Sequence, residues 1–188
     1  MAQEETKKKI QNYEMEEITI SNELRKQYEQ ATGEIEYNMT NDFMFRAILQ
    51  RNHKVLKGLC TSLLHLNSKE ITSIQILNPI NLGEARDDKD FILDIQIEID
   101  HKQLLDLEMQ VINYADWPER SLSYLCRMYD QLSSGEDYKN VKQTQFIGII
   151  DFDLFPKYPE LYAHYKLVNV GKKHKNIYTD KFIMSVLN

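Results

Sequence analysis

Two acidic residues, Asp94 and Glu108, lie in neighbouring segments whose side chains alternate between apolar and polar. Alternation with a period of two is typical of a strand with one buried face, so residues 91–99 and 105–111 are predicted to form an antiparallel hairpin. Residues directly opposite in such a pair share a face of the sheet. A connecting loop of odd length, or a bulge, would therefore bring Asp94 together with Glu108 and Gln110, and we expect one of these two.

Two carboxylates and a backbone carbonyl on one face would form a hard oxygen site that suits Mg²⁺ or Mn²⁺. An ion held there can activate water and neutralise charge on a phosphodiester. A polar strand face exposed to solvent produces the same alternation, and the residues alone favour that simpler interpretation.

The two strands also resemble a known family. Leu93-Asp94-Ile95 and Leu107-Glu108-Met109-Gln110 resemble the PD-(D/E)XK nuclease superfamily, and more narrowly the Rpn-type family of recombination-promoting nucleases, also described as transposases. Three further stretches match that family in the same order along the chain: Asn41 to Phe45, Arg120 to Gln131, and Asp151 to Phe155.

The resemblance implies an α/β fold, in which a mixed central sheet of the restriction-endonuclease type is flanked by helices. It implies metal-dependent DNA cleavage in recombination or transposition, with Mg²⁺ or Mn²⁺ held by Asp94, Glu108 and the carbonyl of Met109. Gln110 stands where most of the wider superfamily has a lysine, although glutamine is typical of the narrower family. A glutamine can orient water or phosphate but brings no charge and cannot act as a general base. Lys89 and Arg120 are then the candidates for a charge-stabilising group.

Two predicted helices carry further candidates. Asp42 opens a helix after Thr40 or Asn41, where it is either an accessory acidic ligand, as the resemblance implies, or a first-turn acid favoured by the helix dipole. Pro118 marks the start of a second helix. Its predicted core face carries Leu122, Leu125, Tyr129 and Leu132, and its opposite stripe carries Arg120, Tyr124, Arg127 and Gln131. That stripe is a solvent face or, because the resemblance places the helix beside the active site, a phosphate-contacting surface.

Composition sets wider bounds. The 188 residues suffice for one globular domain, and a net charge of −6 argues against DNA binding by bulk electrostatics. No apolar run approaches the ~20 residues that cross a bilayer, so no membrane partner is expected. The only cysteines are Cys60 and Cys126, and both are predicted to be core residues. So few cysteines suit a reducing compartment, and we expect the protein in the cytoplasm.

We expect a polar arm over residues 1–38, helical near residues 22–31, and a nuclease-like domain over residues 39–188. The resembled family commonly continues further, so a C-terminal truncation is expected. DNA is the predicted partner, and self-association is left open. The alternative function is a catalytically inactive nuclease-fold module that binds DNA or a protein partner, which the acidic charge and Gln110 favour and the paired acids oppose. An RNA nuclease or a toxin-like nuclease of phage defence is a third reading.

Overall fold

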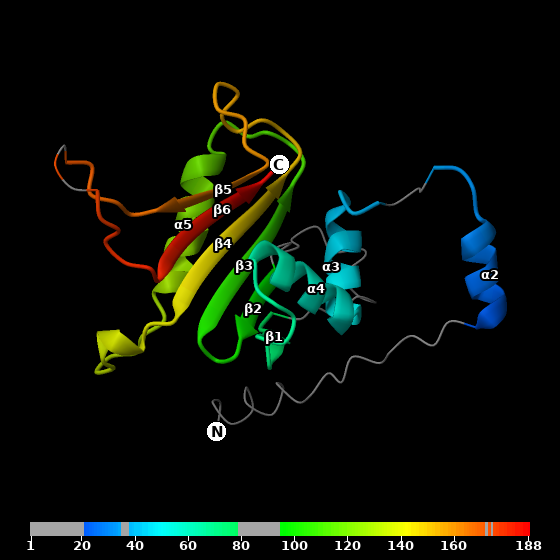
Figure 1. The fold of residues 1–188 in the computed structure, drawn as a ribbon, viewed down its shortest axis with the longest axis horizontal. Coiled ribbons are helices and arrows are strands. Elements are labelled where there is room, and N and C mark those ends of the chain that lie inside the picture. Colours follow the sequence, from blue (N-terminus) through cyan, green and yellow to red (C-terminus); the bar gives the residue numbers. More distant parts are fainter. Residues whose placement is uncertain (1–20, 35–37, 79–94, 172, 174) are drawn as a thin grey trace.

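The computed structural model describes residues 21–34, 38–78, 95–171, 173 and 175–188, and its ribbon is shown in Figure 1. Its central element is a sheet of six strands in the order β1-β2-β3-β4-β6-β5. The strands are β1 (Ile74–Ile76), β2 (Ile95–Ile99), β3 (Gln103–Gln110), β4 (Gln143–Ile150), β5 (Tyr162–Lys166) and β6 (Phe182–Leu187). The helices are α2 (Asn22–Gln30), α3 (Asp42–Arg51), α4 (His53–Leu63), α5 (Trp117–Tyr129) and the short 3₁₀ helix η1 (Tyr138–Asn140).

The predicted hairpin is formed by β2 and β3, which pair antiparallel. Ile99 faces Gln103, so the loop consists of Asp100, His101 and Lys102, and the predicted odd loop length is confirmed. Asp100 and His101 adopt positive φ angles of 51° and 56°, a left-handed conformation that Asp and His tolerate better than bulky residues do. The Asp100 carboxylate accepts hydrogen bonds from the backbone of residues 72 and 73, which ties the loop to the segment before β1.

The next connection is of a different kind, because β3 and β4 run parallel. Parallel neighbours need a crossover connection, and α5 supplies it. In this register Glu108 of β3 lies opposite Gly148 of β4. β4 also pairs parallel with β6, whereas β5 and β6 are antiparallel. The sheet is therefore mixed and flanked by helices, as predicted.

Helices pack on both faces of the sheet. Leu56, Cys60 and Leu63 of α4, with residues of α3, share one core cluster with Ile95, Ile97 and Ile99 of β2 and Leu105 and Leu107 of β3. On the other face, α5 forms a second cluster that contains Leu104, Trp117, Leu125, Met128, Phe146, Ile150 and Val186. Figure 1 shows α5 passing behind the strands, with α3 and α4 near the β1 edge. The polar residues of β3 thus face a helix, and not open solvent.

Some local predictions were wrong. The face of α5 that is buried carries Trp117, Ser121, Leu125 and Met128, whereas Leu122 is 48% exposed. The large Trp117 ring and the small Ser121 turn the helix so that Leu122 points outward. Cys126, on the same outer side, is exposed, and only Cys60 is buried.

The N-terminal region is described only in part. The predicted helical segment forms α2, and its described side chains are exposed. Residues 1–20 lie outside the described part. None of the described helices is both long and apolar enough to span a membrane.

Candidate active site

A cleft of about 450 Å³ lies beyond the carboxyl end of β3. Its walls come from the start of α3, the end of β3 with the segment that follows, and the start of α5. The lining residues are Thr40, Asn41, Asp42, Glu108, Met109, Gln110, Val111, Ile112, Tyr114 and Arg120. Segments separated by about seventy positions therefore contribute polar groups to one hollow. This volume falls in the usual range for small-molecule and substrate sites.

Glu108 is the acid at the centre of the cleft. Its side chain is only 4% exposed, and its Oε1 atom accepts a charge-assisted hydrogen bond from Nη2 of Arg120. Arg120 lies at the start of α5, where its backbone N–H donates to the carbonyl of Asp116. Burial disfavours the charge on Arg120, but the Glu108 carboxylate favours it, and the net effect is a raised pKa. The cleft thus contains a buried glutamate paired with a guanidinium whose charged form is favoured.

Tyr124 holds the guanidinium from the other side. The Arg120 Cζ atom lies 5.6 Å from the centre of the Tyr124 ring, and Arg127 lies 5.9 Å from the same ring. Both distances are typical of cation–π contacts. Tyr124 itself packs on Phe146 of β4, with ring centres 6.4 Å apart. One aromatic ring therefore connects the predicted arginine stripe to the core.

Gln110 and Met109 complete the end of β3. The Gln110 side chain is buried, and its amide nitrogen donates to the Ile112 carbonyl at 2.8 Å, which fixes the orientation of the amide. Met109 packs its side chain against the cluster below α3 and α4, while its backbone forms part of the cleft wall. Gln110 therefore shares a face of β3 with Glu108, whereas the side chain of Met109 points to the opposite face.

Asp42 enters the cleft from the opposite wall. Asn41 caps α3 by accepting a hydrogen bond from the Met44 N–H at 3.0 Å, which confirms the predicted cap and places Asp42 in the first turn. Burial raises the pKa of Asp42, and a backbone hydrogen bond partly offsets the increase. Asp42 thus lines the same cleft as Glu108, and its role as an accessory ligand or as a first-turn acid stays a prediction.

The remaining predicted site residues are Asp94, Lys89 and Gln131. Asp94 and Lys89 lie outside the described residues. Gln131 lies past the end of α5, where it donates to Thr144 Oγ1 at 2.7 Å and accepts from the Lys142 N–H. Its position is at the amino end of β4, so it joins α5 to the sheet and does not line the cleft.

Two residues near the site, one of them in the cleft, were not singled out from the sequence. Asp106 is a second acid on the same face of β3, and only 1% of it is exposed. Its alternation with Glu108 was visible in the sequence, but its burial depends on α5. Tyr114 lines the cleft from the segment between β3 and α5, and no pattern in the sequence distinguished it from other loop aromatics.

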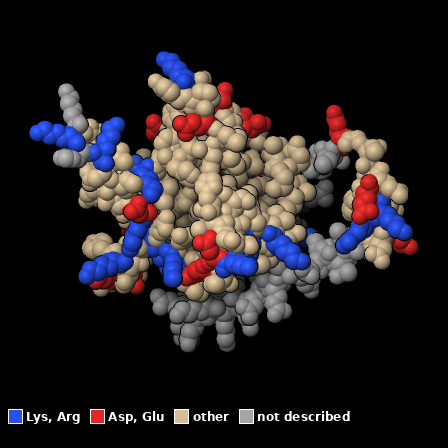
Figure 2. All heavy atoms as spheres, in the orientation of Figure 1, with Lys and Arg blue, Asp and Glu red and all other residues tan. Residues whose placement is uncertain are grey.

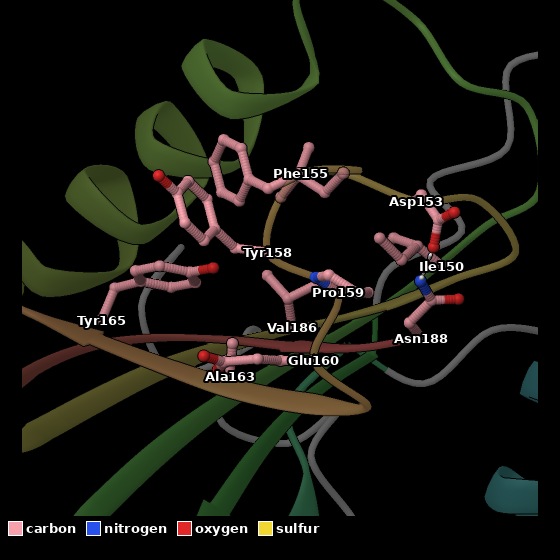
Figure 3. Close-up of a pocket in the computed structure, with 11 residues that line it drawn as sticks. Ile150, Asp153, Phe155, Tyr158, Pro159, Glu160, Ala163, Tyr165, Val186 and Asn188 are labelled. Carbon is pink, nitrogen blue, oxygen red and sulfur yellow. Dashed lines mark hydrogen bonds between the residues drawn. The ribbon is translucent and has the colours of Figure 1, made fainter.

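A second pocket, drawn in Figure 3, lies between the segment after β4 and strands β5 and β6. Figure 3 shows Phe155, Tyr158 and Tyr165 on one side of it and Asp153 hydrogen-bonded to Asn188 on the other. Its volume of about 20 Å³ is room for about one water molecule, so it cannot hold a substrate. The family-like stretch at residues 151–155 is therefore structural here, with Phe152 packed against Trp117 at 6.4 Å.

The charged surface differs between the two ends of the sheet. In Figure 2, acidic side chains gather at the upper end, where the segment after β4 lies in Figure 1, and basic ones lie mainly along the lower and left edges. In the described chain no group of three or more His, Cys, Asp or Glu residues is arranged to hold a metal ion.

Comparison with known proteins adds the family. Curated proteins and solved structures gave no significant match. The family model described as PD-(D/E)XK nuclease family transposase matches residues 39–188, which is most of the chain and includes every residue of the cleft. The mixed sheet with helices on both faces and the acidic cleft at the end of β3 agree with that match. The chain therefore belongs to the PD-(D/E)XK nuclease family transposases.

Proposed function

We propose that this protein is a metal-dependent DNA endonuclease that cleaves phosphodiester bonds in recombination or transposition. The observation that carries the proposal is the cleft itself, in which Glu108, Gln110, Asp42 and Arg120 converge at the carboxyl end of β3. The family match supports a nuclease, and the cleft supplies the acids and the phosphate-binding cation that phosphodiester cleavage requires.

The residues present fit a hard divalent cation. Glu108 and Asp42 offer carboxylate oxygens, and the backbone of Met109 lies beside them. Arg120 pairs with Glu108, so a positive charge is accommodated beside this carboxylate. We propose Asp94 as the other main ligand. In the register of the hairpin, Ile95 pairs with Leu107. Asp94 comes directly before Ile95, and Glu108 comes directly after Leu107. Continuing this register by one residue, we propose that the two carboxylates lie opposite each other on one face of the sheet.

The roles of the chain's own groups follow from their positions. A bound Mg²⁺ or Mn²⁺ would supply an activated water and offset charge developing on the phosphate. Gln110, with its amide nitrogen anchored on Ile112, orients the phosphate or the water without adding charge. Arg120 is the cation within reach of a phosphate, since its side chain is 35% exposed and Tyr124 supports its guanidinium. Asp42 acts as an accessory acid on the far wall.

The experiment is cleavage of supercoiled and linear DNA by the purified protein in Mg²⁺, Mn²⁺, Ca²⁺ or EDTA. Asp94→Asn and Glu108→Gln keep the size of each side chain and remove its charge. The matched control is Glu119→Gln, an acid in the first turn of α5 that does not line the cleft. We expect cutting that needs Mg²⁺ or Mn²⁺, is lost in both cleft variants and is retained in the control.

RNA is included as a parallel substrate. Cutting of RNA but not of DNA would contradict the proposed substrate and leave the catalytic cleft in place. Equal cutting by Glu108→Gln and the wild type would contradict the site itself.

A second candidate function is a module that has lost catalysis and binds DNA or a protein partner. The pair between Glu108 and Arg120 favours it, because a buried ion pair can serve a purely structural purpose. An inert wild type that still binds labelled DNA, or fails to bind Mn²⁺ at all, would support this second function over the first.

A further inference from the structure

Glu108 and Arg120 are matched so closely that the arginine occupies the position a cation would take. The carboxylate is 4% exposed, and a charge buried to that extent is costly unless an opposite charge compensates it. In the metal-free protein Arg120 provides that charge through its Nη2 atom on Oε1. A divalent cation that binds this carboxylate would therefore have to compete with the guanidinium of Arg120.

The Arg120 side chain is only partly buried. Its side chain is 35% exposed, and it reaches Glu108 from the wall of the cleft. Its second neighbour is Tyr124, whose ring lies within cation–π distance and which also favours the charged guanidinium. Because Tyr124 is itself held by Phe146, the guanidinium can leave Glu108 while keeping the ring as support.

We propose that Arg120 is the resident counter-ion of Glu108 in the metal-free protein, and that a divalent cation binding at Glu108 displaces it into the cleft, where it binds a phosphate of the nucleic acid. The proposal rests on the proposed function and adds an order of events to it. A guanidinium and a divalent cation at one carboxylate repel each other, because both are positively charged. Metal binding therefore releases the arginine that phosphate binding requires.

Two sites coupled in this way must influence each other reciprocally. Metal should tighten the binding of DNA, and DNA should tighten the binding of metal, and both effects should depend on Arg120. If Arg120 had only a structural role, its replacement would disorder Glu108 and lower the affinity for the metal ion. If Arg120 competes with the metal ion, its replacement raises that affinity. The sign of the change in metal affinity thus separates the two roles.

The experiment measures Mn²⁺ binding to the free protein by isothermal titration calorimetry, without any activity readout. The variants are Arg120→Gln and, as matched control, Arg127→Gln, which removes an equal charge from the same helix and the same tyrosine ring. We expect Arg120→Gln to bind Mn²⁺ about tenfold more tightly than the wild type, because the competing guanidinium is gone. A tenfold change in affinity corresponds to ~1.4 kcal/mol in binding free energy. The control should bind as the wild type does. Unchanged or weaker binding by Arg120→Gln would overturn the inference.

The second measurement is binding of a fluorescein-labelled DNA duplex by anisotropy, with and without Ca²⁺. The cation should tighten DNA binding to the wild type and to Arg127→Gln but not to Arg120→Gln. An equal effect of Ca²⁺ on all three proteins would contradict the release of Arg120.

A third readout does not depend on the folding of Arg120→Gln. In the wild type, the ¹⁵Nε NMR signal of Arg120, assigned with Arg120→Lys, should shift on addition of Mg²⁺, while that of Arg127 should not. A signal of Arg120 that is unaffected by saturating Mg²⁺ would overturn the inference. Glu108→Gln separates the two levels of the argument. If that variant binds Mn²⁺ as the wild type does, the proposed metal site is wrong. If Glu108→Gln weakens Mn²⁺ binding but Arg120→Gln leaves it unchanged, the metal site stands and only the displacement of Arg120 is rejected.

Discussion

Gly148 lies directly against the indole ring of Trp117. A Cβ atom added to this glycine would lie 2.4 Å from Cζ2 and 2.6 Å from Cη2 of the ring, closer than any such contact allows. Gly148 is also the residue of β4 that faces Glu108 of β3, and Trp117 is the first residue of α5. The contact therefore sets the start of α5 close to the sheet at the position where Arg120 meets Glu108.

Replacing Gly148 with alanine should destabilise the protein, because the buried Trp117 ring must move to admit a methyl group. Overpacking of this kind costs about 1–3 kcal/mol, which urea denaturation monitored by Trp117 fluorescence can measure. The matched control is Gly58→Ala in α4, where an added Cβ meets nothing within 4 Å. That change should stabilise the protein by about 1 kcal/mol through helix propensity. Similar effects of both substitutions would refute the close packing at Gly148.

The link between Glu98 and Lys142 should make stability depend on pH. A hydrogen bond from Lys142 is the main cause of the lowered pKa of Glu98, which burial opposes and His101 reinforces. A depressed carboxyl pKa contributes stability above its ordinary value of 4.5, and this is lost as the pH falls through the lower folded-state value.

Glu98→Gln should therefore lower the free energy of unfolding at neutral pH and lose this effect in acid, as measured by denaturation at a series of pH values. Glu29→Gln in the exposed helix α2 serves as the control and should show no such pH dependence. A deficit in Glu98→Gln that grows as the pH is lowered would have the wrong sign for this ion pair.

Asp42→Asn should weaken the binding of the metal ion while leaving the fold intact. The carboxylate lies in the cleft, and burial already raises its pKa, so a neutral amide removes a desolvation cost along with a favourable helix-dipole interaction. We expect the free energy of unfolding to change by less than about 1 kcal/mol. The Mn²⁺ concentration for half-maximal cleavage should rise about tenfold, as for other groups that support a metal site. The control is Glu119→Gln, which changes a first-turn acid outside the cleft and should alter neither the free energy of unfolding nor the Mn²⁺ concentration for half-maximal cleavage. If Asp42→Asn needs no more Mn²⁺ than the wild type does, Asp42 is not an accessory ligand.

The two cysteines should differ sharply in reactivity. Burial raises the pKa of Cys60 to about 12, whereas Cys126 lies exposed on the outer side of α5. Because the thiolate is the reactive form, a disulfide reagent should modify Cys126 rapidly in the folded protein and Cys60 only after unfolding. Counting released chromophore before and after adding denaturant tests this, and Cys126→Ser should abolish the fast phase. Rapid modification that survives in Cys126→Ser would show that Cys60 is accessible.

Local patterns in the sequence determined much of the framework. The alternation in β3, the odd loop after Ile99, the cap at Asn41 and the start of α5 next to Pro118 all depend on neighbouring residues, so they were predictable. The same local motifs carried the family resemblance, which the family match bears out. The placement of Asp94 stays a prediction, because it lies outside the described residues.

Tertiary structure decided which side chains meet. The parallel pairing of β3 with β4, the rotation of α5 by Trp117, and the approach of Asp42 across the cleft all depend on contacts between residues far apart in the chain. Helical periodicity alone predicted Leu122 in the core and Gln131 beside Arg120. It contains no information on the packing of Trp117 against Gly148, which lies in another element of the fold. Local sequence sets the direction in which a side chain points along its own element, and only packing sets what it points at.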